Sequence, residues 1–457
     1  MDKIIDIMGQ GLKWVDDRYP VMKVWNEHLA KYYAPKNFNF WYYFGSLAML
    51  VLVIQIVSGI FLTMHYKPDT ALAFASVEYI MRDVPWGWLM RYLHSTGASF
   101  FFIVVYLHMF RGLMYGSYRG PRELLWLIGV VILLALMAEA FMGYLLPWGN
   151  MSLWGAQVII SLFGAIPVIG DMLTEFIRGD FVVGDATLNR FFALHVVAVP
   201  LALAGLVFVH IVALHKVGSN NPDGIEIKKN KGSDGIPVDG IPFHPYYTVK
   251  DIVGVAGFLI LYFAVVFFVP EFGGWFLEAD NFTPADLLKT PAHIVPLWYF
   301  TPYYSLLRAC TDMFVVYGLV PLTIIMTLMV LKANQNTMVR AATVGLAAVL
   351  MLGYFTLEAK FWGVVLMGMG IVLFAFLPWL DRSPVKSIRY KGWMFKLALA
   401  IFVVVFIILG YLGTQPAAGP AVLAAQICTI LYLLFFLLMP WYTTWDKTKP
   451  EPERVTK

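Results

Sequence analysis

Residues 91–112 read RYLHSTGASFFFIVVYLHMFRG, an apolar stretch with a histidine near each end. A helix of this length crosses the hydrocarbon core of a bilayer, which is about 30 Å thick. The histidines, His94 and His108, are 14 residues apart, and this spacing is close to four turns of roughly 3.6 residues. Both imidazoles therefore lie on one helix face, about 21 Å apart along the axis. The stretch predicts a membrane-spanning helix that presents histidines at two depths.

A second apolar stretch repeats this arrangement. Residues 190–210 read RFFALHVVAVPLALAGLVFVH and carry His195 and His210, 15 residues apart. The span order given below makes both stretches run from the outer to the inner surface, so His94 shares the depth of His195 and His108 that of His210. Facing imidazoles can ligate two haem irons axially. Zinc or copper is less favoured because neither depth offers a carboxylate or thiolate at ligand spacing. Hydrogen bonding between helices is the structural alternative.

The composition agrees with a membrane protein. Of 457 residues, 60% are hydrophobic and 14% are charged, whereas soluble proteins carry about 25% charged residues. A net charge of +4 gives no reason to expect a nucleic-acid partner. The two cysteines, Cys310 and Cys428, exclude a disulfide scaffold, a cysteine zinc cluster and the CxxCH attachment of a c-type haem. The charged N-terminus lacks the apolar core of a signal peptide, so no cleaved signal is expected.

Ten stretches are long and apolar enough to span a bilayer as helices, which predicts an all-α polytopic membrane protein. The expected spans are 41–64, 93–114, 123–146, 191–215, 250–270, 312–331, 340–357, 361–380, 397–413 and 421–440. An even number of spans places both termini on one side. The segments on that side hold 24 of the 33 Lys and Arg residues, and those on the opposite side hold 8. Because positive charge favours the cytoplasm, both termini are expected there.

Two segments on the outer side, 147–190 and 271–311, are rich in proline, glycine and aromatic residues and show no obvious helix. Loops of that length are usually functional. The polar tail after Trp445 is expected to be mobile.

Glycines repeat with nearly the same period as the histidines. Gly45 and Gly59 are 14 residues apart in the first span, as are Gly129 and Gly143 in the third. Glycine lets a backbone approach a flat ligand closely, although small residues also favour ordinary helix packing in membranes. Two pairs with this period favour a bundle of the first four spans around two stacked haems.

Three arginines, Arg91, Arg111 and Arg190, lie near span ends at the expected depth of a haem edge. An arginine there can pair with a haem propionate through charge-assisted hydrogen bonds. The alternative is an interfacial anchor or a topology signal.

At these residues the sequence resembles the cytochrome b subunits of the ubiquinol–cytochrome c oxidoreductases, respiratory complex III, of bacterial type. The resemblance covers most of the chain. Its motifs stand here as RYLHSTGASFFFIVVYLHMFRG, FMGYLLPWGNMSLWGAQVI, RFFALHVVAVP, HKVGSNNPDG, IPFHPYYTVKDI and TPAHIVPLWYF.

The resemblance implies an enzyme subunit in the bacterial inner membrane, with ubiquinol and ubiquinone as substrates and two non-covalent haem b groups. Ubiquinol would be oxidised at an outer site. One electron would pass to a Rieske iron–sulfur protein and on to a c-type cytochrome. The other would cross the low-potential haem, held by His94 and His195, and the high-potential haem, held by His108 and His210, to reduce quinone at an inner site. Proton release outside and uptake inside would make the step electrogenic, and the complex would be a homodimer.

The resemblance also implies the quinone sites. Trp126 would be a further haem contact in the third span. The inner site would use His215, Ser219, Asn220, Lys250 and Asp251. The outer site would use Phe141, Gly155, Pro296, Tyr299 and Tyr304, with segment 147–165 docking the Rieske protein. A histidine and an acid beside a quinone can deliver protons to its carbonyls. From sequence alone, Lys250 and Asp251 are also typical of an interfacial helix start.

The chain departs from the resembled pattern at three places. The spacing of 15 between His195 and His210 exceeds the 14 of the mitochondrial form, and a kink at Pro200 is expected to absorb the extra residue. Segment 312–357 resembles an inserted hairpin, because KFWGVVLMG at 360–368 matches the usual start of the next helix. Leu297 occupies the position of the usual acid of the outer site.

Glu139 is the hypothesis for replacing that acid. It is the only acid well inside an expected span, and such residues are costly and often functional. Glu139 is four residues from Gly143, on the face expected to meet the outer haem. We therefore predict that Glu139 accepts a proton during quinol oxidation; a protonated carboxyl hydrogen-bonded in the bundle is the alternative.

Together these interpretations predict six parts of the chain. They are a cytoplasmic N-terminal segment (1–40), the haem- and quinone-binding helices (41–270), the outer quinol-site loop (271–311), the inserted hairpin (312–357), the C-terminal helices (358–440) and a cytoplasmic tail (441–457). The alternative from another class is a haem-free proton-coupled transporter with the histidines as a relay. The sequence shows no inverted repeat to favour that alternative.

Overall fold

The computed structural model describes residues 2–26 and 30–456; residues 1, 27–29 and 457, which belong to the expected terminal segments, lie outside the described residues. All ten expected spans are helical, which confirms the all-α polytopic fold. They run over Phe40–Thr63, Gly87–Tyr115, Glu123–Leu145, Asp185–Val217, Phe243–Phe268, Asp312–Ala333, Thr337–Thr356, Ala359–Leu380, Trp393–Gly413 and Pro420–Leu437. The second and fourth begin about six residues earlier than expected: the second starts with the apolar turn Gly87–Met90, and the fourth with the polar turn Asp185–Leu188.

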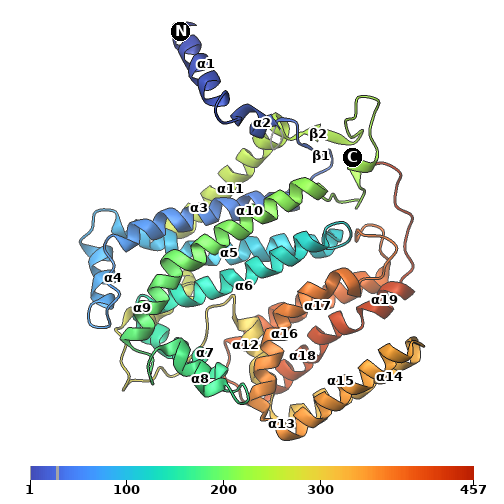
Figure 1. Cartoon of the computed structure of the whole chain (residues 1–457). Helices are drawn as coiled ribbons and strands as arrows, with labels where there is room; N and C mark the ends of the chain where they lie inside the picture. Colours follow the sequence, from blue (N-terminus) through green and yellow to red (C-terminus); the bar gives the residue numbers. More distant parts are fainter. Residues whose placement is uncertain (1, 27–29, 457) are drawn as a thin grey trace.

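Four helices form the N-terminal bundle (Figure 1). They are α3 (Tyr43–Thr63, after the 3-10 turn η2, Phe40–Tyr42), α5 (Gly87–Tyr115), α6 (Glu123–Leu145) and α10 (Val199–Val217). Helix α3 packs along α5, and α6 packs along α10. The histidine-bearing helices α5 and α10 thus come from different pairs and face each other across the bundle.

A π-helical turn, η3 (Leu194–Ala198), joins α9 (Asp185–Ala193) to α10 and contains His195. Proline has no N–H to donate, and Pro200 lies shortly after this turn. A π turn holds about one residue more than an α turn, so the 15-residue spacing to His210 fits the same depth as 14 residues of regular helix. The extra residue is accommodated by this π turn, which ends two residues before Pro200, and not by the expected proline kink.

The outer segments contain short helices that the sequence did not predict. They are α4 (Ala73–Arg82), α7 (Asn150–Phe163), α8 (Gly170–Arg178), η6 (Phe272–Gly274), η7 (Ala279–Phe282) and α12 (Thr301–Ala309). The expectation of no helix in 147–190 and 271–311 was therefore wrong. These helices are stabilised by tertiary contacts such as Ser152 N–H donating to Asn281 Oδ1 at 2.9 Å.

The end of the bundle at which α10 ends and α11 begins carries a two-stranded antiparallel ribbon. Strand β1 (Tyr33–Pro35) pairs with β2 (Gly240–Pro242), with Tyr33 opposite Pro242. The remaining elements on the N-terminal side are α1 (Asp2–Asp16), α2 (Val21–Trp25), η4 (Ile227–Lys229), η5 (Phe243–Tyr247) and α11 (Thr248–Phe268). The ribbon ties the N-terminal segment to the start of α11, and the C-terminus lies beside it (Figure 1).

The C-terminal tail is held in place, so the expectation of a mobile tail was wrong. Arg454 Nη2 donates to Asp239 Oδ1 at 2.9 Å, and Val455 is buried. Thr456 N–H donates to Asp223 Oδ2 at 2.9 Å. Burial alone would raise the pKa of Asp239, but hydrogen bonds from Arg454 and Lys36 lower this pKa to about 2. These contacts could not be predicted from the polar sequence of the tail, because the partner residues lie some 215 positions away in the chain.

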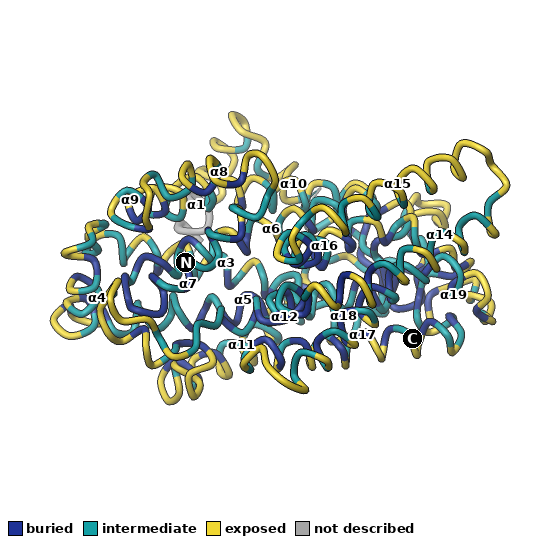
Figure 2. Tube along the Cα trace, turned by 90° about the horizontal axis from the view of Figure 1, so that it is seen from below, coloured by how far each residue is buried: buried dark blue, intermediate teal, exposed yellow. Residues whose placement is uncertain are grey.

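The C-terminal helices α16 (Ala359–Leu380), α17 (Trp393–Gly413), α18 (Pro420–Leu437) and α19 (Met439–Trp445) share a core with α5, α6 and α12. The expected hairpin consists of α13 (Asp312–Phe314), η8 (Val315–Leu319), α14 (Val320–Ala333) and α15 (Thr337–Thr356). No residue of α14 or α15 is buried, and Figure 2 shows α15 exposed along the edge of the molecule.

Candidate functional site: two histidine pairs and their surroundings

The four histidines form two facing pairs. The ring centres of His94 and His195 are 6.1 Å apart with perpendicular ring planes, and those of His108 and His210 are 6.5 Å apart. A metal–imidazole nitrogen bond is about 2 Å long, so two imidazoles on opposite sides of one metal ion have ring centres about 6 Å apart. Both pairs have the separation that one metal ion between them requires.

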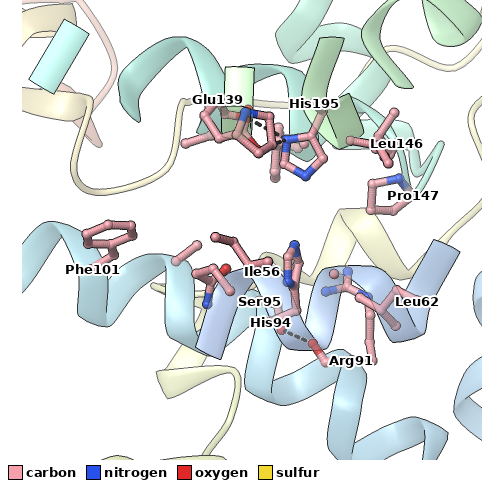
Figure 3. A pocket seen from close by; sticks show the side chains of 18 of the residues that line it. Ile56, Leu62, Arg91, His94, Ser95, Phe101, Glu139, Leu146, Pro147 and His195 are labelled. Carbon is pink, nitrogen blue, oxygen red and sulfur yellow. Dashed lines mark hydrogen bonds and ion pairs between the residues drawn. The ribbon is translucent and has the colours of Figure 1, made fainter. Parts of the chain in front are cut away.

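A cavity of about 420 Å³ lies between the outer pair. Figure 3 shows His94 and His195 pointing toward each other from opposite walls, with Arg91 and Pro147 also lining the space. The lining is mostly apolar, with only a few polar groups, which is typical of a cofactor pocket. Its volume and its two opposed imidazoles fit a flat macrocycle with an axially ligated iron.

Each of the four glycines lies against one histidine, whereas the sequence predicted that they border the flat ligands. A Cβ added at Gly59 would be 3.1 Å from His94 Cε1, and one added at Gly45 would be 3.4 Å from His108 Cε1. A Cβ at Gly129 would be 3.4 Å from His210 Cε1. At Gly143 it would overlap the His195 ring. The glycines therefore clear the space in which the imidazoles lie.

The outer imidazoles have neighbours on their Nδ1 side. Ser58 Oγ is 3.0 Å from His94 Nδ1. His195 Nδ1 lies 2.9 Å from the Glu139 carbonyl oxygen and 3.0 Å from Glu139 Oε1. A partner on Nδ1 orients the ring and leaves Nε2 for a metal. Sequence reasoning missed Ser58, which no spacing distinguishes from other serines in membrane helices.

The predicted arginine and tryptophan contacts have different surroundings. Arg111 Nη2 is 3.3 Å from His108 Nδ1, and Arg91 lines the outer cavity. Arg190 is exposed and donates to the Phe176 carbonyl at 2.6 Å, away from the cavity lining. Trp126 Nε1 donates to the Phe374 carbonyl at 2.6 Å and joins α6 to α16. The geometry supports a haem-edge role for Arg91 and Arg111 and gives no support to Arg190.

Of the predicted outer residues, only Tyr299 is among the described residues that line the same cavity. Tyr299 lines it and stacks on Phe102 with ring centres 3.9 Å apart. Gly155 lies beside Tyr144, where an added Cβ would be 3.7 Å from the ring. The other predicted outer residues do not line the cavity: Phe141 packs on Phe191, Tyr304 packs under Arg308, and Pro296 is partly buried next to Leu297.

The predicted inner residues lie around the β1–β2 ribbon. Tyr32, which sequence reasoning missed, packs edge-on against His215 with ring centres 4.6 Å apart, and its hydroxyl is 2.8 Å from Ser219 Oγ. Burial raises the pKa of Tyr32 above its ordinary value. Asn220 Nδ2 donates to the Tyr115 carbonyl at 2.7 Å, while its buried Oδ1 has no partner.

Lys250 and Asp251 form the first turn of α11, directly after β2 and η5. Lys250 Nζ lies 4.4 Å from the Tyr246 ring centre. The ribbon thus sets the start of α11 beside Tyr32 and the end of α10.

Comparison with known proteins identifies the family. Residues 29–218 match the family described as Cytochrome b/b6/petB, and residues 284–433 match Cytochrome b(C-terminal)/b6/petD. The protein named Cytochrome b from Allochromatium vinosum is 59% identical over 451 residues, which cover 98% of each chain. The chain belongs to the cytochrome b family. As a cytochrome b of a bc-type complex, it binds haem b and transfers electrons in a respiratory chain.

Two other cytochrome b relatives bear on its assembly. The protein named Cytochrome b/c1 from Bradyrhizobium diazoefficiens is 40% identical, and the match covers 98% of this chain and 56% of that protein. A chain of the solved structure titled Hyperthermophilic respiratory Complex III has a TM-score of 0.78 at 35% identity, covering 95% of this chain and 99% of that one. Cytochrome b membership favours electron transfer over the transporter alternative.

Replacing Gly143 of this cytochrome b by valine is expected to remove or shift the outer haem signal while the inner one is retained. The added side chain would occupy the space of the His195 ring, whereas the inner pair lies about 20 Å away along the helix. A reduced-minus-oxidised absorption spectrum of the membranes measures this. The matched control is Gly205→Val, because an added Cβ at Gly205 on α10 meets nothing within 4 Å. An unchanged spectrum for Gly143→Val would show that the glycine is not needed for the ligand position.

Proposed function

We propose that this chain is the quinol-oxidising subunit of a ubiquinol–cytochrome c oxidoreductase. The observation that carries the proposal is the pair of histidine sites at two depths between the same helices, with ring centres 6.1 and 6.5 Å apart. His94 and His195 would hold the low-potential haem b, and His108 and His210 the high-potential one. When bound, the two haems supply an electron path from the outer to the inner quinone site.

The chain's own groups would orient these ligands and their charges. Ser58 and Glu139 would orient the outer imidazoles, and the four glycines would leave room for the imidazole rings between the helices. Arg91 and Arg111, near opposite ends of α5, would pair with propionates by charge-assisted hydrogen bonds. Their positions at the outer cavity and beside His108 support this assignment.

At the outer site, the extension of the cavity to Leu297 and Tyr299 supports quinol binding there. Oxidation would deliver one electron to a Rieske protein docked on segment 147–165. Exposed apolar side chains at Val168, Met172 and Phe176, just beyond that segment, support a partner on this surface. The relative named Cytochrome b/c1 supports a c-type cytochrome as the next partner.

At the inner site, His215, Ser219 and Asn220 would bind the quinone with Lys250 and Asp251. The free carbonyl oxygen of Asn220 and the hydroxyl pair of Tyr32 and Ser219 support a polar ligand. Proton uptake from the cytoplasm at this site and release outside would couple electron transfer to proton translocation. Homodimerisation and location in the bacterial inner membrane, with both termini cytoplasmic, stay predictions that accompany this function.

Asp251→Asn is expected to slow quinone reduction at the inner site about tenfold or more, because a proton donor is lost where the quinone is reduced. The first electron's exit to the Rieske protein should stay unchanged. Flash-induced or stopped-flow reoxidation of the inner haem measures the effect. Asp234→Asn, an exposed acid in the loop between α10 and α11, is the matched control. Reoxidation of the inner haem at the wild-type rate in Asp251→Asn would contradict the assignment of Asp251 as a proton donor.

Purification of the complex through a tag on this chain tests the function as a whole. We expect two spectrally distinct b-type haems, a co-purifying Rieske protein and c-type cytochrome, and quinol-dependent reduction of cytochrome c. A preparation without haem would favour the proton-coupled transporter instead. Haem without quinol oxidation would contradict the enzyme assignment.

A further inference from the structure

The outer end of α6 and the following outer loop meet in one direct side-chain contact. Tyr144, the next-to-last residue of α6, donates its hydroxyl hydrogen to Glu278 Oε2 at 2.9 Å. Glu278 lies just before η7 and is only half-buried. Tyr144 itself lines the cavity between the outer histidines, as do Leu277 and Asn281 on either side of Glu278. The contact therefore links the cavity to the carboxylate of a residue that is only partly buried.

The surroundings of Glu278 suit a group that gains and loses a proton near neutral pH. Burial, helped by the negative charge of Asp280, raises the pKa of Glu278 to about 7, although hydrogen bonds from its own backbone N–H and from the Tyr144 hydroxyl act in the opposite direction. The charged and titratable groups acting on it among the described residues are Tyr144, Asp280 and Tyr299. No cation among them stabilises the ionised carboxylate.

The other candidates for a proton acceptor at this cavity are less suitable. Leu297 is apolar and buried. The Glu139 carboxylate lies 3.0 Å from His195 Nδ1, so it is already engaged with an imidazole. The prediction that Glu139 accepts the proton stays untested, and it competes with Glu278.

We propose that Tyr144 and Glu278 form the path by which the second proton of the quinol leaves the outer site. This inference rests on the proposed quinol oxidation. Oxidation of one quinol releases two electrons and two protons; the step assigned here moves one proton and no electron. Tyr144 Oη takes the proton from the quinol hydroxyl while its own proton passes to Glu278 Oε2, so the tyrosine stays neutral. Glu278 then releases the proton to the outer water.

The sign of the pH dependence follows from the acceptor's charge. Glu278 accepts a proton only when ionised, so the rate of quinol oxidation rises with pH and levels off above its pKa of about 7. In Glu278→Gln this rise near pH 7 is lost, and the rate above that pH falls about tenfold or more, as expected for loss of a general base. Tyr144→Phe, which removes the linking hydroxyl, has the same effect. Glu278→Asp keeps the rise with a smaller loss of rate.

The test uses the purified complex, measuring quinol-dependent cytochrome c reduction from about pH 5.5 to 9. The matched control is Glu271→Gln, an exposed acid in the same loop; it keeps the wild-type rate and profile. Both haem spectra are recorded for every variant, because the relay predicts that they are unchanged. If Glu278→Gln fails to assemble, Tyr144→Phe and Glu278→Asp decide.

Two results would overturn the relay. One is a wild-type rate and pH profile in both Glu278→Gln and Tyr144→Phe. The other is loss of the rise near pH 7 in Glu139→Gln alone, which would assign the proton to Glu139. A wild-type complex that does not oxidise quinol contradicts the proposed function instead, so the two failures are distinguishable.

Discussion

His94→Leu or His195→Leu is expected to remove the low-potential haem from the spectrum and to leave the high-potential haem in place. His108→Leu or His210→Leu should do the reverse. The reason is that each iron would be held by two imidazoles on different helices, and the two pairs lie at different depths. When one imidazole of a pair is removed, the other has no opposed histidine, and the haem between them would no longer be held.

Redox titration of the b-type absorption bands in purified membranes measures this separation. His65→Leu is the control, because His65 packs near Phe61 and Tyr79 at the outer end of α3 and belongs to neither pair. Equal loss of both components from all four substitutions, in a chain that still inserts and folds, would count against two separate sites.

Lys391→Met is expected to reduce the free energy of unfolding by about 3 to 5 kcal/mol, the range for removing one partner of a buried ion pair. Lys391 and Asp381 are fully buried side chains at the inner surface, with Nζ and Oδ2 2.5 Å apart. Tyr118 also donates to Asp381 Oδ2 at 2.7 Å. Burial alone would raise the pKa of Asp381, but Lys391 and Arg119 hold it below its ordinary value. Without Lys391 the carboxylate stays buried and loses its nearest cation.

Thermal inactivation of the purified complex reports this destabilisation. Lys396→Met, an exposed lysine in the first turn of α17, is the matched control and should change stability little. The double variant Lys391→Met with Asp381→Leu should recover part of the loss, because both buried charges are then gone. A single variant as stable as the control would show that Asp381 is neutral in the folded protein.

The sequence predicted the spans and the depths of the histidines and glycines because these depend on helical periodicity within one element. Gly59 and His94 lie on different helices, yet each is placed by the period of its own helix. Groups placed by tertiary contacts escaped prediction. Tyr32 lies against His215 only because β1 pairs with β2, and Glu278 lies beside Tyr144 only because the outer loop folds over α6.

The same limit explains the errors. Arg190 is near a span end in sequence, but it turns outward to the Phe176 carbonyl on α8, a helix that the sequence did not reveal. The tail after Trp445 is polar because it binds two buried acids rather than because it is free in solvent.

The π turn at His195 affects how the sequence of this helix is aligned with that of other proteins. One residue inserted into a regular α-helix rotates everything after it by about 100° and would turn one of two spaced side chains away from its partner. Here the surplus is confined to five residues, Leu194–Ala198, and regular helix resumes before His210. Insertions and deletions of one residue in this region are thus compatible with two opposed imidazoles. An alignment gap between these histidines is not evidence that a relative has lost a ligand.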